Sequence, residues 1–411
     1  MVVITAETSL FFMLGLAAVL IIGFVGRAIA NKTAVPSRIW LIIFGIIIGP
    51  ILGFVRYESL VPYLPFVTNL VILLILFNAG LNIKLAKLIH GVPRGLTTSL
   101  VNFLIVVLSV GVLMYFLGYS IILSILIGLI VAGVSLSAMS AWGQKNPYEA
   151  SNKTLLTLES SLSEPLSIIL VLILISAILL HNYSFSFVTT SLISEFSIGF
   201  VLGALVAMVW VPMMSHFQRK RYEYSYVASL AMVFLVYTLS QELNGSGPIS
   251  ALIFGIIISN GEEIFRALKY RHSISFNLNK ESKSFNNLVT FFTTSFFFVY
   301  FGAMITLQDY PSFVVGLVIA LVILLARFSG TYISLFKSKY SGTDKIIVSS
   351  MMSRGIGTAI VATIPIAYSI KNTSNLVDVV FSVIFFTVFF NSVLVELARK
   401  RQVSIAKTAG V

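Results

Sequence analysis

The chain has 411 residues, of which 58% are hydrophobic and 10% are charged, and its formal net charge is +12. A mean hydropathy of +1.00 excludes a water-facing surface of ordinary polarity, so most of the surface must face lipid. The long apolar segments lack the period-two alternation of barrel strands, and helices satisfy their own backbone hydrogen bonds in hydrocarbon. We therefore predict an all-α polytopic membrane protein embedded in a lipid bilayer.

Several classes of function are excluded by what the sequence lacks. With no cysteine there can be no disulfide framework, thiolate metal site or cysteine nucleophile. The sequence contains no His-Glu-x-x-His motif, and its histidines lie in or beside loops, so we expect neither an enzyme nor a cofactor. The basic residues lie at the ends of apolar segments and form no single patch, which argues against a nucleic-acid partner.

The lengths of the apolar segments predict how many times the chain crosses the bilayer. A hydrocarbon core about 30 Å thick requires roughly 20 apolar residues per helix. The sequence contains thirteen such segments, the ninth of them short, near 8–29, 37–55, 66–83, 95–117, 119–142, 155–180, 188–213, 224–241, 247–260, 285–308, 313–335, 346–370 and 375–397.

The distribution of Lys and Arg predicts the orientation, because cytoplasmic loops carry an excess of these residues. Taking alternate connections, 23 of the 27 basic residues fall on one side and only Arg56 and Lys371 on the other. The remaining two, Arg327 and Arg354, lie within spans. This asymmetry predicts thirteen spans, an outside N-terminus and a cytoplasmic C-terminus.

Residues 1–411 are predicted to form a single membrane transporter domain, because no hydrophilic stretch is long enough for a soluble one. Thirteen spans divide as six, a linker span and six, an odd count that allows the two halves to be inverted in the membrane. This division predicts a first repeat at about 8–180, a linker span at 188–213 and a second repeat at 224–397. Residues 398–411 would form a basic cytoplasmic tail.

Span 6 carries the densest group of polar residues at membrane depth: Glu159, Ser160, Ser163, Glu164 and Pro165. Ionisable groups at this depth are costly, so each one is a functional candidate. At about 100° per residue, Ser160 and Glu164 share one helix face, whereas Glu159 and Ser163 share a neighbouring face. Pro165 leaves a carbonyl free and predicts a break or kink in the helix. These oxygens suit a hard monovalent cation; Glu159 either contributes to the site or pairs with an arginine.

Span 5 contains a run of small and hydroxyl residues that includes Val134 and Ser135 within residues 133–140. Such runs serve either as helix-packing contacts or as the unwound part of a discontinuous helix.

Span 12 sets Arg354 between apolar residues and follows it with Gly355 and Gly357, so we expect a helix break there. A buried arginine requires a carboxylate partner, and Glu159 or Glu164 would supply it.

These residues resemble the monovalent cation/proton antiporter superfamily, and within it the sodium/proton exchanger branch with archaeal thirteen-span members. Residues 159–165 have the spacing of the family's Glu-Ser pair followed by Asn-Asp-Pro. Residues 128–137 resemble the Gly-x-x-x-x-Pro-Thr-Asp-Pro-Ala stretch of the family's unwound span 5, and Ser353-Arg354-Gly355 resembles the Arg-Gly that opens its second unwound helix. Residues 76–81 and 250–255 are similar to further family segments.

The resemblance implies a plasma-membrane homodimer, each subunit having inverted repeats, two unwound crossing helices in spans 5 and 12, a dimerisation domain and a moving core around spans 5, 6, 12 and 13. It also implies alternating access, in which a monovalent cation, Na⁺ by preference, and a proton compete for one carboxylate. The implied ion site comprises Glu164, Ser160 and Ser135, with Val134 and Glu159 beside it. Arg354 and Ser163 would be structural partners.

Two departures from the family pattern bear on the mechanism. Ser135 occupies the position of the family's aspartate and Val134 that of a threonine, and Ser163-Glu164 replaces Asn-Asp. If Glu159 neutralises Arg354, Glu164 remains as the single titratable anion, which predicts electroneutral one-for-one exchange. A cation channel or uniporter, or a transporter with different or lost ion coupling, is the alternative on the same scaffold.

Overall fold

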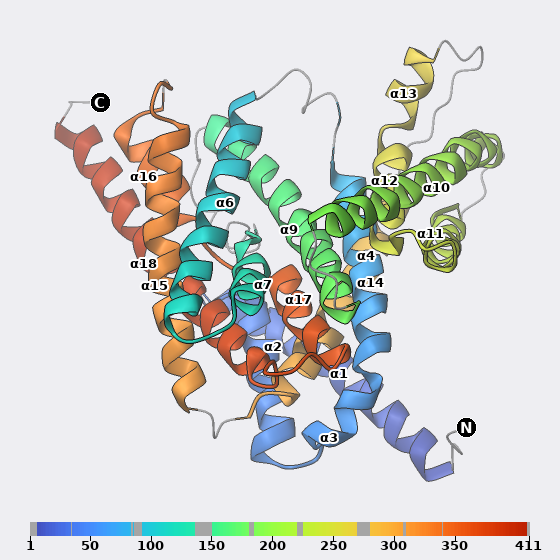
Figure 1. Cartoon of the computed structure of the whole chain (residues 1–411), viewed down its shortest axis with the longest axis horizontal. Coiled ribbons are helices and arrows are strands. Elements are labelled where there is room, and N and C mark those ends of the chain that lie inside the picture. The colour runs from blue at the N-terminus through green and yellow to red at the C-terminus, as the bar shows by residue number, and fades with distance from the viewer. Residues whose placement is uncertain are drawn as a thin grey trace.

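The computed structural model describes residues 6–33, 35–83, 85, 93–135, 150–180, 185–219, 225–268, 280–306, 310–338 and 340–408. All regular secondary structure in these ranges is helical (Figure 1), which confirms the all-α prediction. The helices are α1 (Ala6–Lys32), α2 (Ser37–Ile46), η1 (Ile47–Ile51), α3 (Tyr57–Leu60), η2 (Val61–Tyr63), α4 (Leu64–Asn82), α6 (Pro93–Phe116), α7 (Ile121–Ala132), α9 (Ala150–Leu179), α10 (Phe185–Arg219), α11 (Ser225–Glu242), α12 (Gly247–Ser259), α13 (Gly261–Ala267), α14 (Lys280–Ala303), α15 (Tyr310–Ser334), α16 (Gly342–Ser350), α17 (Ile356–Ala367) and α18 (Leu376–Thr408).

Many of these helices have the length and hydropathy of membrane spans. Seven qualify individually, and α12 with α13, which meet at 77°, would add an eighth. Four shorter apolar segments lie at 37–51, 121–132, 226–242 and 356–367. Every predicted span range contains helical residues, and the count of thirteen stays a prediction.

The helices pack mainly within two groups (Figure 1). We call α1, α2, α4, α10, α11, α12 and α14 the scaffold bundle, and α6, α7, α9, α15, α16, α17 and α18 the crossing bundle. In Figure 1, α10 to α13 lie at the right, whereas α6, α15, α16 and α18 lie at the left. The two bundles meet where α4 contacts α9 and α17 and where α14 contacts α17.

The scaffold bundle is held together by close helix contacts at small residues. Gly80 of α4 faces Gly255 of α12, and a Cβ on Gly80 would come within 3.0 Å of the Gly255 Cα. Small residues let helix backbones approach in a membrane, where dispersion and backbone contacts replace the hydrophobic driving force. The two apolar segments that resembled the family, 76–81 and 250–255, therefore form one helix–helix contact.

The crossing bundle contains an interrupted helix. α16 ends at Ser350 and α17 begins at Ile356, with Met351–Gly355 between them outside any helix. α7 ends at Ala132 and is followed by the non-helical residues 133–135. Residues 136–149, which include the rest of the predicted span 5, lie outside the described residues.

One local expectation was wrong. Pro165 does not break its helix, because α9 continues through it as one helix of 30 residues. Loss of a single amide donor inside a long packed helix does not outweigh the remaining hydrogen bonds. α18 continues as a helix to Thr408, so the predicted cytoplasmic tail at 398–411 begins within this helix, and its location stays a prediction.

Candidate ion-binding site

The end of α7 and the break between α16 and α17 are joined by backbone pairing. The amide of Ser135 donates to the carbonyl of Ser353 at 3.0 Å. The Ser353 hydroxyl donates to the carbonyl of Ser135 at 2.8 Å. Neither segment is helical at this point, so their backbone groups would lack hydrogen-bond partners without this contact. The pairing places residues of predicted spans 5 and 12 side by side in the interior.

Helix α9 supplies serines that bind the end of α7. The amide of Val134 donates to the Ser163 hydroxyl at 3.1 Å, and the Ser167 hydroxyl donates to the carbonyl of Leu129 at 2.6 Å. Ser163 and Ser167 are four residues apart and therefore lie on one face of α9. Ser163 thus has the structural position that the sequence predicted, and it brings residues 133–135 against α9.

Glu164 projects from α9 to the N-terminus of α17. Its Oε1 accepts a hydrogen bond from the Gly357 amide at 2.8 Å. The positive end of the helix dipole and the unpaired first-turn amides make such a terminus a binding site for an anion. A Cβ on Gly357 would come within 2.6 Å of Glu164 Oε1, so only glycine allows the carboxylate to approach this closely. Glu164 is partly exposed, unlike the fully buried Glu159.

Arg38 completes this group and was missed by the sequence analysis. It lies in the first turn of α2, and its Nη1 donates to Ser135 Oγ at 2.9 Å. Its charge interacts with that of Glu164. From the sequence, Arg38 was expected to be a loop cation because it lies at the edge of an apolar segment. No linear signal distinguished it, since its partners come from α7 and α9.

Ser160 lies one helical turn before Glu164 on α9, so the two share a helix face, and Ser160 is buried. Its hydroxyl donates to the Thr157 carbonyl at 3.2 Å, which leaves the oxygen lone pairs able to accept or coordinate. Glu164, Ser160 and Ser135 thus supply oxygens of the kind that a hard cation prefers.

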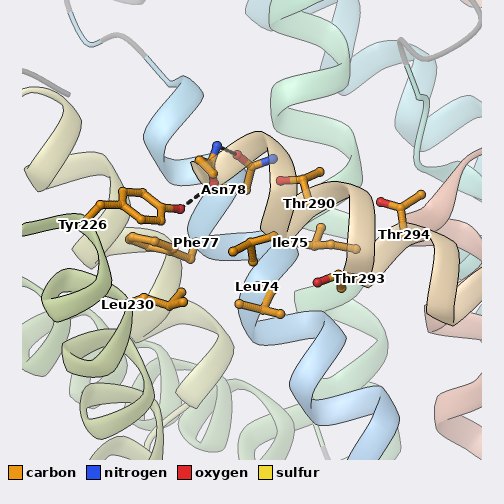
Figure 2. A pocket seen from close by; sticks show the side chains of 11 residues that line it. Leu74, Ile75, Phe77, Asn78, Tyr226, Leu230, Thr290, Thr293 and Thr294 are labelled. Carbon is orange, nitrogen blue, oxygen red and sulfur yellow. Dashed lines mark hydrogen bonds between the residues drawn. The ribbon is translucent and has the colours of Figure 1, made fainter. Parts of the chain in front are cut away.

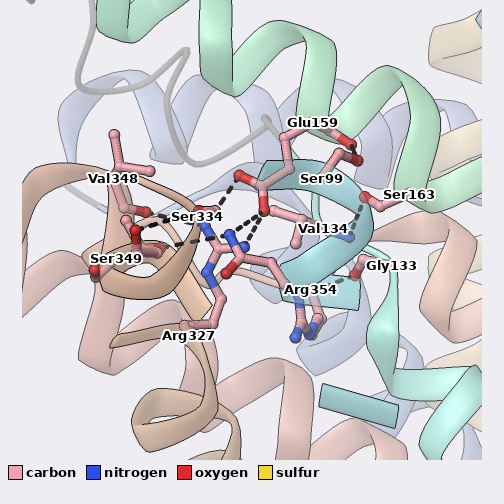
Figure 3. Close-up of polar contacts among 12 residues, drawn as sticks. Ser99, Gly133, Val134, Glu159, Ser163, Arg327, Ser334, Val348, Ser349 and Arg354 are labelled. Atoms are coloured by element: carbon pink, nitrogen blue, oxygen red, sulfur yellow. Dashed lines mark hydrogen bonds and ion pairs between the residues drawn. The ribbon is translucent and has the colours of Figure 1, made fainter. Parts of the chain in front are cut away.

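Glu159 is committed to a different cluster, shown in Figure 3. Both of its carboxylate oxygens bind Arg327 of α15, and Asn102 of α6 donates to Oε1 at 3.0 Å. Arg327 also donates to the Val348 carbonyl at 2.9 Å. The cluster joins α6, α9, α15 and α16. Of the two roles left open for Glu159, its contacts match the structural one.

Arg354 forms no hydrogen-bonded ion pair with either expected carboxylate among the described residues, although the charge of Glu159 acts on it. Arg354 Nη1 donates to the carbonyl of Gly133 at 3.2 Å, while Glu159 pairs with Arg327 (Figure 3). Arg354 is 1% exposed, and its Nε and Nη2 bond to no described residue. Its position in the helix break directs it to the carbonyls that α7 leaves unpaired at its C-terminus, where a cation is stabilised. Gly355 lies at the end of this break, and Gly357 lies in the first turn of α17.

A second polar cluster lies in the scaffold bundle and lines a small cavity of about 20 Å³ (Figure 2). Asn286 of α14 donates to Asn78 Oδ1 of α4 at 2.9 Å, and the Tyr226 hydroxyl of α11 donates to Asn286 Oδ1 at 2.5 Å. These bonds join three helices and satisfy the polar groups, so the cluster is structural. Among the described residues there is no group of three or more His, Cys, Asp or Glu side chains that could hold a metal ion.

Apolar helices in two bundles, an interrupted helix, and a partly exposed carboxylate at its break define a multi-pass membrane transport protein. The chain belongs to the sodium/hydrogen exchanger transmembrane family, whose sequence profile matches residues 14–398. This confirms the resemblance seen in the sequence. The family consists of transporters and not of enzymes.

Individual relatives agree with the family assignment. The chain is 26% identical over 364 residues to Na⁺/H⁺ antiporter 1 of Methanocaldococcus jannaschii, a match that covers 85% of this chain and 81% of that protein. The structure of the sodium proton antiporter MjNhaP1 from the same organism at pH 8 superposes with a TM-score of 0.80 at 22% identity, covering 95% of this chain and 99% of that one. An electron-microscopy structure of MjNhaP1 gives a TM-score of 0.72 at 22% identity, with coverages of 96% and 98%. The fold is therefore that of a sodium/proton antiporter.

Proposed function

We propose that this protein exchanges Na⁺ for H⁺ across the plasma membrane by alternating access, with Glu164 as the carboxylate that carries either ion. Family membership and a relative named as a Na⁺/H⁺ antiporter support this reaction. Ser160 and Ser135 would supply further oxygens to the cation. Val134 helps to hold Ser135 in place through the bond of its amide to Ser163.

The observation that carries the assignment is the contrast between the two acids of α9. Glu159 is buried with both oxygens bound by Arg327, so it is already neutralised. Glu164 is partly exposed, lies against the break before α17, and accepts a hydrogen bond from the Gly357 backbone amide. A carboxylate in this position can release a proton and bind a cation without breaking a two-point ion pair of the kind that holds Glu159.

One-for-one exchange follows from the same contrast. A single available carboxylate holds one proton or one Na⁺, so each cycle would move one charge in each direction. The exchange would then be electrically silent, whereas a uniporter or channel on this scaffold would pass current. Ser163, the neutral residue directly before Glu164, agrees with this count, because the family resemblance implies that a second acid at that position accompanies electrogenic exchange.

The test is transport in proteoliposomes containing the purified protein. Glu164→Gln should abolish Na⁺-driven proton movement, because glutamine can neither release the proton nor bind Na⁺ with a charge. Glu262→Gln is the matched control: it makes the same change in an exposed pair with Arg266 on α13 and should leave exchange intact. Exchange that survives Glu164→Gln would refute the role of Glu164.

Repeated contacts in the structure support the proposed inverted repeats at about 8–180 and 224–397. If the halves are related, spans 2 and 3 correspond to spans 9 and 10. The contact of α2 with α14 then corresponds to that of α12 with α4, and both contacts are extensive. The contacts of α6 with α9 and of α15 with α18 correspond in the same way. The linker span would be α10.

We also propose a homodimer with outside N-termini and cytoplasmic C-termini, on the basis of the family resemblance and the distribution of basic residues. Large apolar side chains are exposed on α1 and α10, among them Phe24 at 71% and Val209 at 70%. Native mass spectrometry from detergent would measure the oligomeric state, and a monomer would refute the dimer. Labelling of single introduced cysteines from either side of the membrane would measure the orientation.

A further inference from the structure

Arg38 spans the boundary between the two bundles. Its backbone belongs to α2, which packs on α1 and α14 of the scaffold bundle. Its guanidinium lies 5.8 Å from the centre of the Phe298 ring of α14, an arrangement that stabilises a cation and holds the side chain to the scaffold. The head group reaches Ser135, which belongs to the crossing bundle.

The head group lies where the proposed ion site is formed. Nη1 donates to Ser135 Oγ at 2.9 Å, and a Cβ on Gly355 would come within 2.7 Å of the same nitrogen. The positive charge of Arg38 attracts the ionised Glu164. The two opposite charges therefore lie on different bundles and act across their boundary.

This attraction depends on the state of Glu164. When Glu164 carries neither Na⁺ nor H⁺, it is negative and attracts Arg38; when it is loaded with either ion, its charge is neutralised and the attraction is largely lost. The Gly357 amide also faces Glu164, but it lies on the same bundle as Glu164. Its hydrogen bond therefore cannot make the attraction between the two bundles depend on the loading of Glu164.

We propose that Arg38 is an electrostatic latch that holds the two bundles together while Glu164 is empty and releases them when Glu164 is loaded. The inference rests on the proposed Na⁺/H⁺ exchange, and it makes Arg38 a positioning residue for coupling. An exchanger must prevent its empty form from crossing between the two access states, because an empty crossing turns exchange into a leak. The latch supplies this restriction.

The experiment compares two sodium fluxes in proteoliposomes with the membrane potential clamped. Tracer counterflow, in which labelled Na⁺ exchanges for unlabelled Na⁺, needs only the loaded form. Net efflux into Na⁺-free medium at alkaline pH on both sides needs the empty form to return. Arg38→Gln should raise the ratio of net efflux to counterflow by about tenfold or more, because one charge interaction across the boundary is lost.

Two variants serve as controls. Arg38→Lys keeps the charge and should keep the low ratio. Arg27→Gln makes the same change in an exposed arginine of α1, whose guanidinium lies 5.7 Å from the Phe291 ring centre, and should also keep the low ratio. An unchanged ratio in Arg38→Gln with counterflow present would overturn the latch. Absence of counterflow in the wild type would instead overturn sodium transport itself.

A charge-restoration test separates the latch from a purely structural role. The chain has no native cysteine, so Arg38→Cys can be modified at one position only. Reaction of this cysteine with an aminoethyl thiosulfonate attaches a positively charged group, whereas reaction with a methyl thiosulfonate attaches a neutral group through the same kind of bond. The cationic adduct should lower the flux ratio and the neutral one should not. Equal effects of the two reagents would overturn the proposal, even if Arg38→Gln proves unstable.

Discussion

The carboxylate of Glu159 and the guanidinium of Arg327 form a two-point ion pair in which the side chains are 1% and 0% exposed. The pair joins α9 to α15 inside the crossing bundle. In the proposed exchange this pair gives Glu159 a structural role, although Glu159 is only five residues from Glu164 in the sequence. The roles of the two acids are therefore set by their partners and not by their residue type.

Arg327→Gln should destabilise the protein by about 3–5 kcal/mol, because Glu159 would remain as an unpaired buried charge. The double variant Glu159→Gln/Arg327→Gln should recover most of this loss. Thermal unfolding in detergent measures both effects, with the exposed Arg56→Gln as the control. Equal unfolding temperatures for Arg327→Gln and Arg56→Gln would contradict the buried pair.

Gly357→Ala should abolish most exchange while the protein still folds. The added methyl group would overlap the Glu164 side chain and push the carboxylate away from the first turn of α17. Gly342→Ala is the matched control, since a Cβ at Gly342, which opens α16, meets no atom within 4 Å. The rate of Na⁺-driven proton movement should fall at least about tenfold in the first variant, and equal rates in the two would refute the packing argument.

Ser135→Asp should lower the KM for Na⁺ by about tenfold, which corresponds to roughly 1.4 kcal/mol of added attraction. The new carboxylate would lie beside Arg38 Nη1 and next to the proposed cation position. Ser135→Ala separates the charge from loss of the hydroxyl and should change the KM far less. The assay is proton flux at graded concentrations of Na⁺, Li⁺ and K⁺. Identical ion profiles in wild type and Ser135→Asp would place position 135 outside the site.

The stability of the protein should depend on pH through Asp344, which lies in the first turn of α16. Burial alone would raise its pKa, but hydrogen bonds from Ser341 and Asn152 outweigh burial and hold the pKa of Asp344 below its ordinary value. Because the folded pKa is lowered, the stabilisation is present above the unfolded pKa of about 3.9 and is lost as the pH falls through the folded value.

Asp344→Ala should therefore lower stability by about 1 kcal/mol at neutral pH through loss of the helix cap. The difference from wild type should shrink as the pH falls below the unfolded pKa of about 3.9, and it should be smallest below the lowered folded pKa, where Asp344 is protonated in the native protein. Unfolding temperatures measured at neutral and acidic pH give both values. A difference that is the same at both would show that the charge of Asp344 contributes nothing.

The sequence by itself determined the fold class and the family, and it predicted where the ion chemistry would lie. Composition alone excluded a soluble protein, because apolar surface on this scale must face lipid. The spacing of Glu159, Ser160, Glu164 and Pro165 along one helix was readable because neighbours on a helix are set by local geometry. That spacing placed the proposed site on α9 and named its carboxylate.

Only the tertiary structure decided which charges meet. Three arginines near apolar segments have partners far along the chain. Arg327 binds Glu159 at a separation of 168 residues, Arg354 binds the carbonyl of Gly133 at 221, and Arg38 binds Ser135 at 97. A linear pattern specifies the face of one helix but not how that face is rotated against its neighbours. Pairing between helices depends on packing, so Arg38 entered the site only when α2, α7 and α9 were placed together.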